Sequence, residues 1–209
     1  MLRLFPVVLF FAFGCSGSSS RLPDASLLKL QERFEKQWGE KSAAGDSVRL
    51  ALAALPGRNE YILYCRAWKH AGRHNLAQAL KTADSLVMGY PAFEKGIYLR
   101  ANLRLENRDT SGSLSDFDRC LKKNPAFFEC RMNRGSLFFV QKMADLAFLD
   151  FREAVKLRPE NAEARLNLGN AHFALGQADS ACVQWKTAAS AGSAAANEIS
   201  NKLCNPVGQ

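Results

Sequence analysis

Residues 125–159 read PAFFECRMNRGSLFFVQKMADLAFLDFREAVKLRP and contain the pattern that decides the fold. Prolines stand at both ends of this stretch, Pro125 and Pro159, 34 residues apart. Between them, apolar residues recur three and four positions apart over 128–141 and again over 144–157, which is the period of an α-helix. Proline cannot continue a helix because it lacks a backbone N–H group. The stretch therefore predicts two helices joined by a short turn.

The same period of 34 residues runs through about 130 residues of the chain without a gap. It brings Pro91 onto Pro125 and Pro159, and elsewhere it places small residues on small ones and aromatic residues on aromatic ones. The superposed sets are Ala67, Ala101, Gly135 and Gly169; Ala79, Ser113, Ala147 and Ala181; Phe117, Phe151 and Trp185; and Cys120, Ala154 and Ala188. Small residues let two helices cross closely, and the aromatic ring fills the space beside the crossing. A fixed period of this kind predicts stacked helical repeats.

These residues resemble the tetratricopeptide (TPR) repeat, a helix-turn-helix unit of the same length. The matching residues are Leu168, Gly169, His172, Ala181, Trp185 and Ala188 in the last unit, and Gly135, Phe138, Ala147, Phe151, Ala154 and Pro159 in the unit before it. The resemblance implies an all-α, TPR-type solenoid of helical hairpins, with units at 60–93, 94–127, 128–161 and 162–192. The first unit departs most, because Ala83 replaces the large aromatic residue.

Both ends of the array are expected to carry capping helices, since each repeat buries its face only against neighbours. At 26–57 we expect a helical pair, either a degenerate repeat or a cap. Its first helix has one apolar stripe, and its second runs from Asp46 to Leu55; the stripe comprises Leu27, Leu30, Phe34 and Trp38. At 193–204 we expect a final helix that begins after Gly192 and has Ala195, Ile199 and Leu203 on one face.

The first residues have the form of an export signal. Arg3 precedes an apolar stretch over 4–14, which is too short to span a bilayer, and Cys15 follows directly. This resembles a bacterial lipoprotein signal, which implies a signal peptide at 1–14, lipidation of Cys15, and a flexible tether over 15–25. The alternative is an ordinary secretory protein. Because Ser16 rather than an acidic residue follows Cys15, the resemblance favours the outer membrane, facing the periplasm.

Composition agrees with a folded, exported chain. The 209 residues are 47% hydrophobic, and beyond residue 14 no apolar run approaches the length of a transmembrane helix. The formal charge of +8 does not indicate nucleic acid, which an exported protein would rarely meet. Anionic headgroups or acidic wall polymer suit such a charge better, and often it has no specific partner.

Cysteine usage gives a second expectation about the end of the array. Five cysteines remain after Cys15, so they cannot all pair within one chain. Cys182 lies on the last predicted repeat and Cys204 at the end of the capping helix, which should pack against it. A disulfide between them suits an exported protein; a buried pair of thiols is the alternative.

In TPR arrays the first helices line a concave groove in which peptides bind, and the resemblance projects this onto aromatic and amide residues here. Aromatic rings supply contact area, and asparagine pairs with backbone amides. The expected groove residues are Tyr61, Tyr64, Trp68, Tyr98, Asn102, Met132, Asn133, Phe139, Asn167, Asn170 and Phe173. The alternative is that these residue types serve the repeat itself, and that the N-terminal pair covers Tyr61 and Trp68.

One specialised use is excluded by position. TPR domains that hold the acidic tails of heat-shock chaperones use two asparagines and several cations. Asn102 and Asn133 match the amides, but Tyr98, Glu163 and Asn167 occupy the cation positions. Without cations a carboxylate would be poorly held.

Arginine and aspartate also recur together, with Arg100 and Asp116 spaced 16 apart, as are Arg134 and Asp150. The last unit has Leu168 and Gln184 at these positions instead. Because the two charges appear and disappear together, we expect a structural bond between the two helices of a unit.

Catalytic chemistry has little support, and we expect no cofactor. His70 and His74 are four apart but lack the glutamate of the zinc-protease helix motif. The sequence therefore predicts a non-enzymatic adaptor that binds a protein or peptide partner, is lipid-anchored in the cell envelope, and has no site for nucleic acid. The alternatives are a metal-dependent enzyme or enzyme accessory using His70 and His74, and a self-associating structural protein.

Overall fold

The computed structural model describes residues 59–204. The predicted signal peptide, the Cys15 tether and the helical pair at 26–57 lie outside the described residues. The chain divides into two units, residues 1–62 and 63–209, and the described residues cover nearly all of the second unit and the last four residues of the first.

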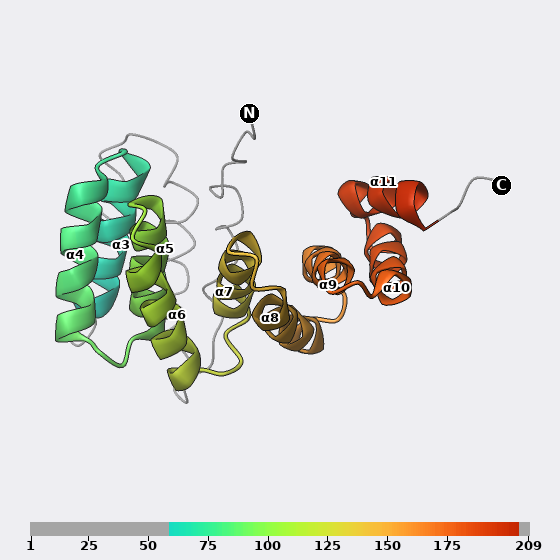
Figure 1. Cartoon of the computed structure of the whole chain (residues 1–209). Coiled ribbons are helices and arrows are strands. Elements are labelled where there is room, and N and C mark those ends of the chain that lie inside the picture. Colours follow the sequence, from blue (N-terminus) through green and yellow to red (C-terminus); the bar gives the residue numbers. More distant parts are fainter. Residues whose placement is uncertain (1–58, 205–209) are drawn as a thin grey trace, which may run out of the picture. The chain divides into compact units, whose positions relative to one another are not determined.

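All regular structure within 59–204 is helical, which confirms the all-α prediction. In chain order the helices are α3 (Asn59–Gly72), α4 (Leu76–Gly89), α5 (Glu94–Glu106), α6 (Thr110–Lys123), α7 (Phe128–Val140), α8 (Ala144–Leu157), α9 (Ala162–Ala174), α10 (Ala178–Ser190) and α11 (Ala194–Leu203). They pair into four antiparallel hairpins, α3–α4 to α9–α10, followed by α11 (Figure 1).

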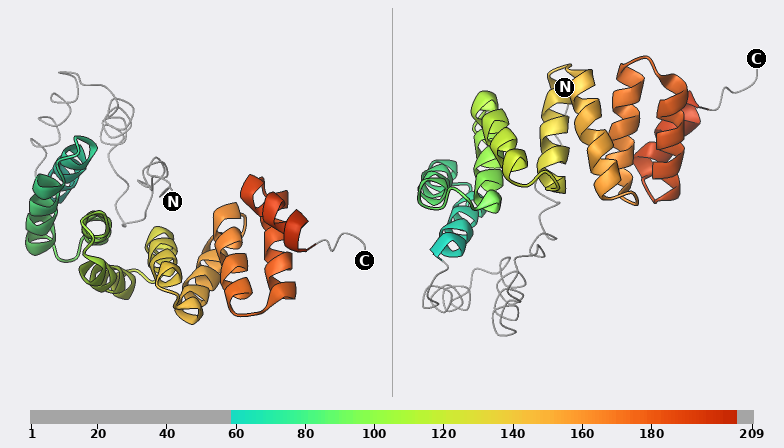
Figure 2. Two further views of the ribbon diagram at one scale, coloured as in Figure 1. Left: turned by 45° about the horizontal axis from the view of Figure 1, so that its top comes forward. Right: turned by 90° about the horizontal axis from the view of Figure 1, so that it is seen from below.

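Consecutive hairpins stack on one another. Helix α4 packs on α5, α6 on α7, and α8 on α9, while α7 also contacts α9 directly. The two views of Figure 2 show the same order of neighbours from α5 to α10. Each second helix therefore lies between the first helix of its own hairpin and the first helix of the next, which is the arrangement of a TPR-type solenoid.

The turn inside each hairpin has one conformation that recurs at the repeat period. His74, Arg108, Lys142 and Gly176 all have positive φ, of 56°, 63°, 62° and 76°. This left-handed conformation ends the first helix and directs the chain back along it. Only the last hairpin uses glycine, the residue that adopts the conformation without a steric cost.

The small residues permit the close helix crossings that the sequence predicts. A Cβ atom added at Gly135 would lie 2.9 Å from a ring carbon of Phe151, and one at Gly169 would lie 2.5 Å from the ring of Trp185. Both aromatic rings are buried. The hairpins are thus closed by a ring lying directly on the backbone of the facing helix.

The predicted arginine–aspartate bonds are confirmed. Arg100 donates to both oxygens of Asp116 at 2.8 and 2.7 Å, and Arg134 does the same to Asp150. Each arginine also donates to an aspartate 16 residues earlier in the chain, Arg100 to Asp84 at 3.1 Å and Arg134 to Asp118 at 2.6 Å. This second set of bonds was not predicted. Each arginine therefore ties its own hairpin together and joins it to the preceding one.

Helix α11 packs on α10, as a cap should, but through a different face from the predicted one. Ala196 and Ser200 are buried, whereas Ala195 is exposed and Leu203 is 54% exposed. Gly192 has φ of +95°, whereas Arg158, at the same position in the preceding unit, has φ of −138°. The chain therefore enters α11 in a new direction, and the small side chains face α10.

Nothing in residues 59–204 forms a helix with the length and hydropathy needed to cross a bilayer.

Candidate functional site

A set of polar side chains links the first helices of the second and third hairpins. The Nδ2 group of Asn133 donates to Asn102 Oδ1 at 2.7 Å and to the Tyr98 hydroxyl at 3.1 Å. Asn102 Nδ2 in turn donates to the backbone carbonyl of Tyr98 at 2.9 Å. We call Tyr98, Asn102 and Asn133 the amide cluster. Three of the residues expected in the groove are thus brought together, but their amide donors are used within the protein.

Tyr98 supports this cluster from inside the protein. Its side chain is 7% exposed and packs against Phe127 and Phe117 at ring-centroid distances of 5.2 and 6.2 Å. Burial raises the pKa of the phenol, and the carboxylates of Glu129 and Glu163 add to the rise. The hydroxyl is therefore neutral at physiological pH. Its ring cannot offer the contact area that the sequence analysis expected of it.

Helix α7 continues the face beyond the amide cluster. Asn133, Ser136 and Val140 are spaced three and four residues apart, so they share one stripe of the helix. Ser136 is exposed, and Val140 is 78% exposed. Neither residue was predicted from the sequence to line the groove. Both residues lie within one helical turn of a predicted groove residue, Asn133 or Phe139, and this spacing could have indicated them.

On helix α9, Asn167, Asn170 and Phe173 are three residues apart. Phe173 stands at the repeat position of Phe139. Phe173 is 48% exposed, with its ring 5.4 Å from that of Trp185. Asn170 Oδ1 accepts a hydrogen bond of 3.0 Å from Trp185 Nε1, so this amide holds the core ring in place. Asn167 is half-buried and forms no side-chain hydrogen bond to another residue in 59–204.

Two further predicted groove residues belong to the packing between hairpins. Met132 is 6% exposed and lies in the core cluster with Phe151 and Leu168. Phe139 is half-buried and packs against the same cluster. These side chains therefore set the spacing of α7 and α9 and add little exposed area of their own.

The three aromatic residues predicted on the first hairpin lie on α3 and are half-buried. Tyr64 packs edge-on against Trp68 and Phe93, with ring centroids 6.3 and 5.8 Å apart. Tyr61 lies one turn before Tyr64 on the same helix. Tyr64 and Trp68 thus contribute to the cluster that joins α3, α4 and α5.

We call the exposed side of α7 and α9 the inner face, defined by Asn133, Ser136, Val140, Asn167 and Phe173. It combines amide groups with exposed apolar side chains. That combination suits an extended polypeptide, which offers main-chain hydrogen-bonding groups and side chains together. No titratable group of this face is placed as a nucleophile with an adjacent base.

The histidine pair does not form a helical metal site. His70 lies in the last turn of α3, which ends at Gly72, whereas His74 lies beyond that end at φ of 56°. The spacing of four residues therefore does not place both imidazoles on one helix face. Across residues 59–204, no group of three histidine, cysteine or acidic side chains is arranged to hold a metal ion.

Two disulfides join neighbouring helices, one at the end of the array and one in its middle. Cys182 and Cys204 form a disulfide between α10 and the end of α11. A second disulfide, Cys120–Cys130, joins α6 to α7 and was not predicted from the sequence. The equivalent residues of the next junction are Ala154 and Ala164, which are buried in one core cluster, but this proximity is known only from the structure.

Comparisons with known proteins agree with this architecture. Models of the tetratricopeptide repeat and of the TPR repeat match residues 98–156 and 145–188. Among curated proteins, no relative matches the sequence.

Several solved structures share the fold at low sequence identity. MamA from Desulfovibrio magneticus matches with a TM-score of 0.65 at 16% identity, covering 71% of this chain and 85% of that one. A tetratricopeptide repeat protein from Parabacteroides merdae matches with a TM-score of 0.65 at 20% identity, covering 86% and 73%. The first TPR domain of Spaghetti (RPAP3), solved with the HSP90 peptide SRMEEVD, matches with a TM-score of 0.50 at 18% identity, covering 53% and 90%.

Proposed function

We propose that this protein is a non-enzymatic scaffold that binds an extended segment of a protein partner on the inner face, and that it is held in the bacterial envelope by a lipid at Cys15. The observation that carries the first half is the exposure of Val140 and Phe173 in the last turns of α7 and α9, on the helices that also carry the amides of Asn133 and Asn167. Binding of protein segments is the common activity of TPR folds, and the RPAP3 structure holds a peptide.

The chemistry of the inner face restricts the ligand. Asn133 already donates to two oxygens within the protein, so it offers an incoming chain its own carbonyl as an acceptor. Glu163 is exposed on α9, at a position where TPR domains that hold acidic tails carry a cation. A segment with apolar side chains and free main-chain N–H groups fits this surface, whereas a C-terminal carboxylate does not.

The interaction half is tested with exposed residues, because substitutions of buried Tyr98 would disturb the fold. We expect Val140→Glu/Phe173→Ser to reduce crosslinked capture of envelope proteins by at least roughly tenfold, because it removes two exposed apolar contacts. The matched control is Met88→Glu on the second helix α4, since Met88 is 81% exposed. Equal capture by the double variant and the control, with circular dichroism unchanged, would overturn the proposal.

The envelope half rests on the resemblance of residues 1–15 to a lipoprotein signal, and the two disulfides support it. Disulfides form and persist in oxidising compartments such as the periplasm. The outer membrane is proposed because Ser16 follows Cys15.

Mass spectrometry of the protein from its native envelope tests the anchor. We expect a mature chain that begins at Cys15 and carries fatty acyl groups, and a Cys15→Ala variant that is released from membranes on washing. A mature chain that begins elsewhere, or an unmodified Cys15, would overturn the lipid anchor and leave the binding proposal standing.

A further inference from the structure

The two disulfides differ in their access to solvent. Cys120 and Cys130 are each 0% exposed and lie in a core cluster with Tyr98 and Phe117. Cys182 and Cys204 are only half-buried. An attacking thiolate must reach a sulfur atom along the line of the S–S bond, so access controls the rate of thiol–disulfide exchange. The buried bond is shielded from such an attack while the protein is folded.

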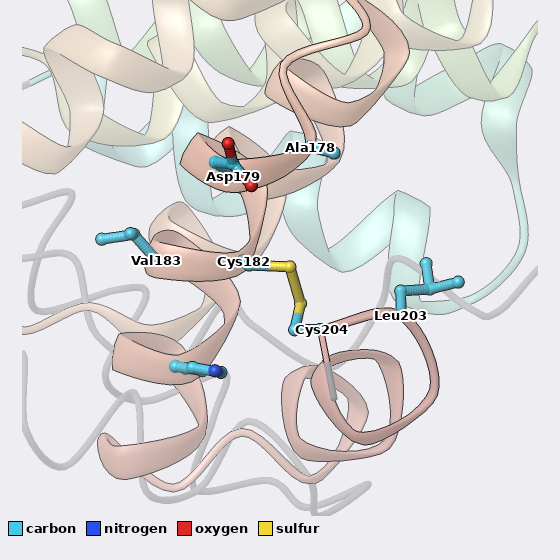
Figure 3. Close-up of a pocket in the computed structure, with 7 residues that line it drawn as sticks. Ala178, Asp179, Cys182, Val183, Leu203 and Cys204 are labelled. Carbon is cyan, nitrogen blue, oxygen red and sulfur yellow. A yellow bond between two sulfur atoms is a disulfide. The ribbon is translucent and has the colours of Figure 1, made fainter. Parts of the chain in front are cut away.

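An open hollow of about 480 Å³ lies directly beside the exposed bond. Both sulfur-bearing residues line it, and Figure 3 shows the bond between α10 and α11 with the surrounding side chains. The remaining lining residues are Ala178, Asp179, Val183, Lys186 and Leu203. Val183 and Leu203 are 60% and 54% exposed, so the hollow has an apolar rim and carries one charge of each sign.

We propose that the Cys182–Cys204 bond is a site of thiol–disulfide exchange, at which a dithiol reductant opens the bond and releases the capping helix α11. The substrate of this site is the exposed dithiol of a small molecule or of an oxidoreductase, which the hollow admits. The inference does not depend on the inner face or on the lipid anchor.

The ends of the helices determine which sulfur leaves. Cys204 is the C-terminal cap of α11, where unpaired carbonyl groups disfavour a thiolate. Cys182 lies in the second turn of α10, with Lys186 one turn further along the same helix. Because the more stable thiolate leaves faster, the external thiolate attacks Cys204 Sγ and Cys182 departs.

The exchange is balanced without any other reactant. The first thiolate forms a bond to Cys204 Sγ as the Sγ–Sγ bond breaks, and the electron pair leaves on Cys182 Sγ, which then takes up a proton. The second thiolate of the reductant attacks the sulfur of the first and releases Cys204 as a thiolate. The reductant becomes a disulfide, and the protein gains two thiols.

Opening the bond has a structural consequence because the noncovalent contacts of α11 are small. The buried side chains of this helix are those of Ala196 and Ser200, and Ile199 is half-buried. Its exposed side includes Asn197, Glu198, Asn201 and Lys202. A helix of 10 residues with so little apolar burial depends on its covalent tie for stable docking.

Differential alkylation of the full oxidised chain tests the site. Thiols present beforehand are blocked, dithiothreitol is added under native conditions, and new thiols are trapped with isotopically labelled iodoacetamide and located by mass spectrometry. We expect labelling of Cys182 and Cys204 at least roughly tenfold faster than of Cys120 and Cys130, because only the first pair is accessible. Equal rates for both pairs, or faster labelling of the buried pair, would overturn the proposal.

A matched pair of charge variants tests the local chemistry. Lys186→Gln should slow the reduction of Cys182–Cys204 about twofold to threefold, and Asp179→Asn should speed it by a similar factor, as expected for one charge near a developing thiolate. Lys202→Gln, on α11 but outside the hollow, should leave the rate unchanged. With glutathione as a monothiol, the mixed disulfide should map to Cys204. A mixed disulfide on Cys182, or equal effects of Lys186→Gln and Lys202→Gln, would contradict the proposed direction of attack.

Hydrogen exchange measures the release of α11. After selective reduction, we expect amide exchange over 194–203 to rise at least tenfold while exchange over 128–157 stays unchanged. A Cys182→Ser/Cys204→Ser variant should show the same pattern without reductant. Protection of α11 that survives both treatments would show that the bond does not control docking.

Discussion

The third and fourth hairpins have the same backbone arrangement but connect their two helices by different chemistry. In the third, Arg134 donates to both oxygens of Asp150 at 2.8 and 2.7 Å. In the fourth, Leu168 and Gln184 stand at the equivalent positions. The polar links there are bonds between uncharged acceptors and their donors, from Trp185 Nε1 to Asn170 at 3.0 Å and from Arg165 to Gln184 Oε1 at 3.2 Å. The fold therefore requires a contact between these helices without prescribing its kind.

The two kinds of link differ in how much stability the protein loses when one of their residues is removed. Asp150 has a side chain that is 3% exposed and also lies 3.5 Å from Arg131, so its charge depends on its arginine partners. Removing one member of a buried ion pair leaves the other uncompensated. The fourth hairpin carries no such charge, and its stability depends on close packing around Trp185.

The largest expected effect comes from breaking the ion pair. Asp150→Ala should lower the free energy of unfolding by about 3 kcal/mol, because Arg134 and Arg131 lose their shared acceptor. Gln184→Ala, the matched change in the fourth hairpin, should cost less than about 1 kcal/mol. Urea denaturation of the oxidised chain measures both. Similar losses in the two hairpins would contradict the distinction.

A double substitution sharpens the same comparison. Arg134→Leu/Asp150→Gln gives the third hairpin the side chains of the fourth, and its stability should lie within about 1 kcal/mol of the parent. A loss as large as that of Asp150→Ala would mean that the third hairpin requires the charges themselves.

Overpacking should affect the fourth hairpin more than the third. Gly169→Ala should cost about 2–3 kcal/mol, since the added Cβ atom would lie 2.5 Å from the Trp185 ring. Gly135→Ala should cost less, because the closest ring atom there is at 2.9 Å. Gly89→Ala is the control, as no atom lies within 4 Å of its added Cβ. Thermal unfolding of the three variants should follow this order, and the reverse order for Gly135 and Gly169 would contradict it.

A smaller effect distinguishes the second hairpin from the others. Ser113 is 0% exposed, and its hydroxyl has no hydrogen-bond partner in the described part of the chain, whereas the other hairpins have alanine at this position. Ser113→Ala should therefore raise stability by about 1 kcal/mol. The reverse change, Ala147→Ser, should lower it by a similar amount. A loss of stability in Ser113→Ala would reveal a bond that this position makes.

The smallest effect concerns the turn. Lys142→Gly should stabilise the third hairpin by about 0.5–1 kcal/mol, because it relieves a left-handed conformation with φ of 62° that glycine adopts freely. Gly176→Ala, at the same position of the fourth hairpin, should destabilise by a similar amount. Opposite signs in chemical denaturation are expected, and equal signs would contradict the assignment of strain to this residue.

Most of the fold follows from periodicity. The 34-residue period predicted the hairpins, and the 16-residue spacing predicted the bond between Arg100 and Asp116. Both patterns occur in more than one unit, so a departure in a single unit does not hide them. The backward bonds to Asp84 and Asp118 obey the same spacing, but they cross from one hairpin to the next. The spacing of residues within one unit therefore does not reveal them.

The face of α11 and the Cys120–Cys130 bond depend on contacts that do not repeat. The positive φ of Gly192 changes the entry into α11, which places Ala196 and Ser200 inward in place of the larger stripe residues. Cys120 and Cys130 occur at one junction only. A pattern that occurs once cannot be separated from chance without the positions of neighbouring helices.

The residues predicted for the groove divide between the surface and the core. Tyr98 and Met132 were selected as contact residues, yet both are buried, because aromatic and apolar residues at these positions also serve the packing between hairpins. Exposure of Val140 and Phe173 depends on where α7 and α9 end relative to their neighbours. That relation follows from three-dimensional packing and not from residue type.

Site-specific photocrosslinking tests the central claim most directly. A photoreactive amino acid is placed at Ser136, exposed on the inner face of α7, or at Asp145, exposed on α8 of the same hairpin. In the native envelope, the account predicts a defined crosslinked partner from position 136 that is absent from position 145 and is lost in Val140→Glu/Phe173→Ser. The same partner crosslinked from position 145 alone, or from both positions regardless of that variant, would contradict the inner face as the binding surface.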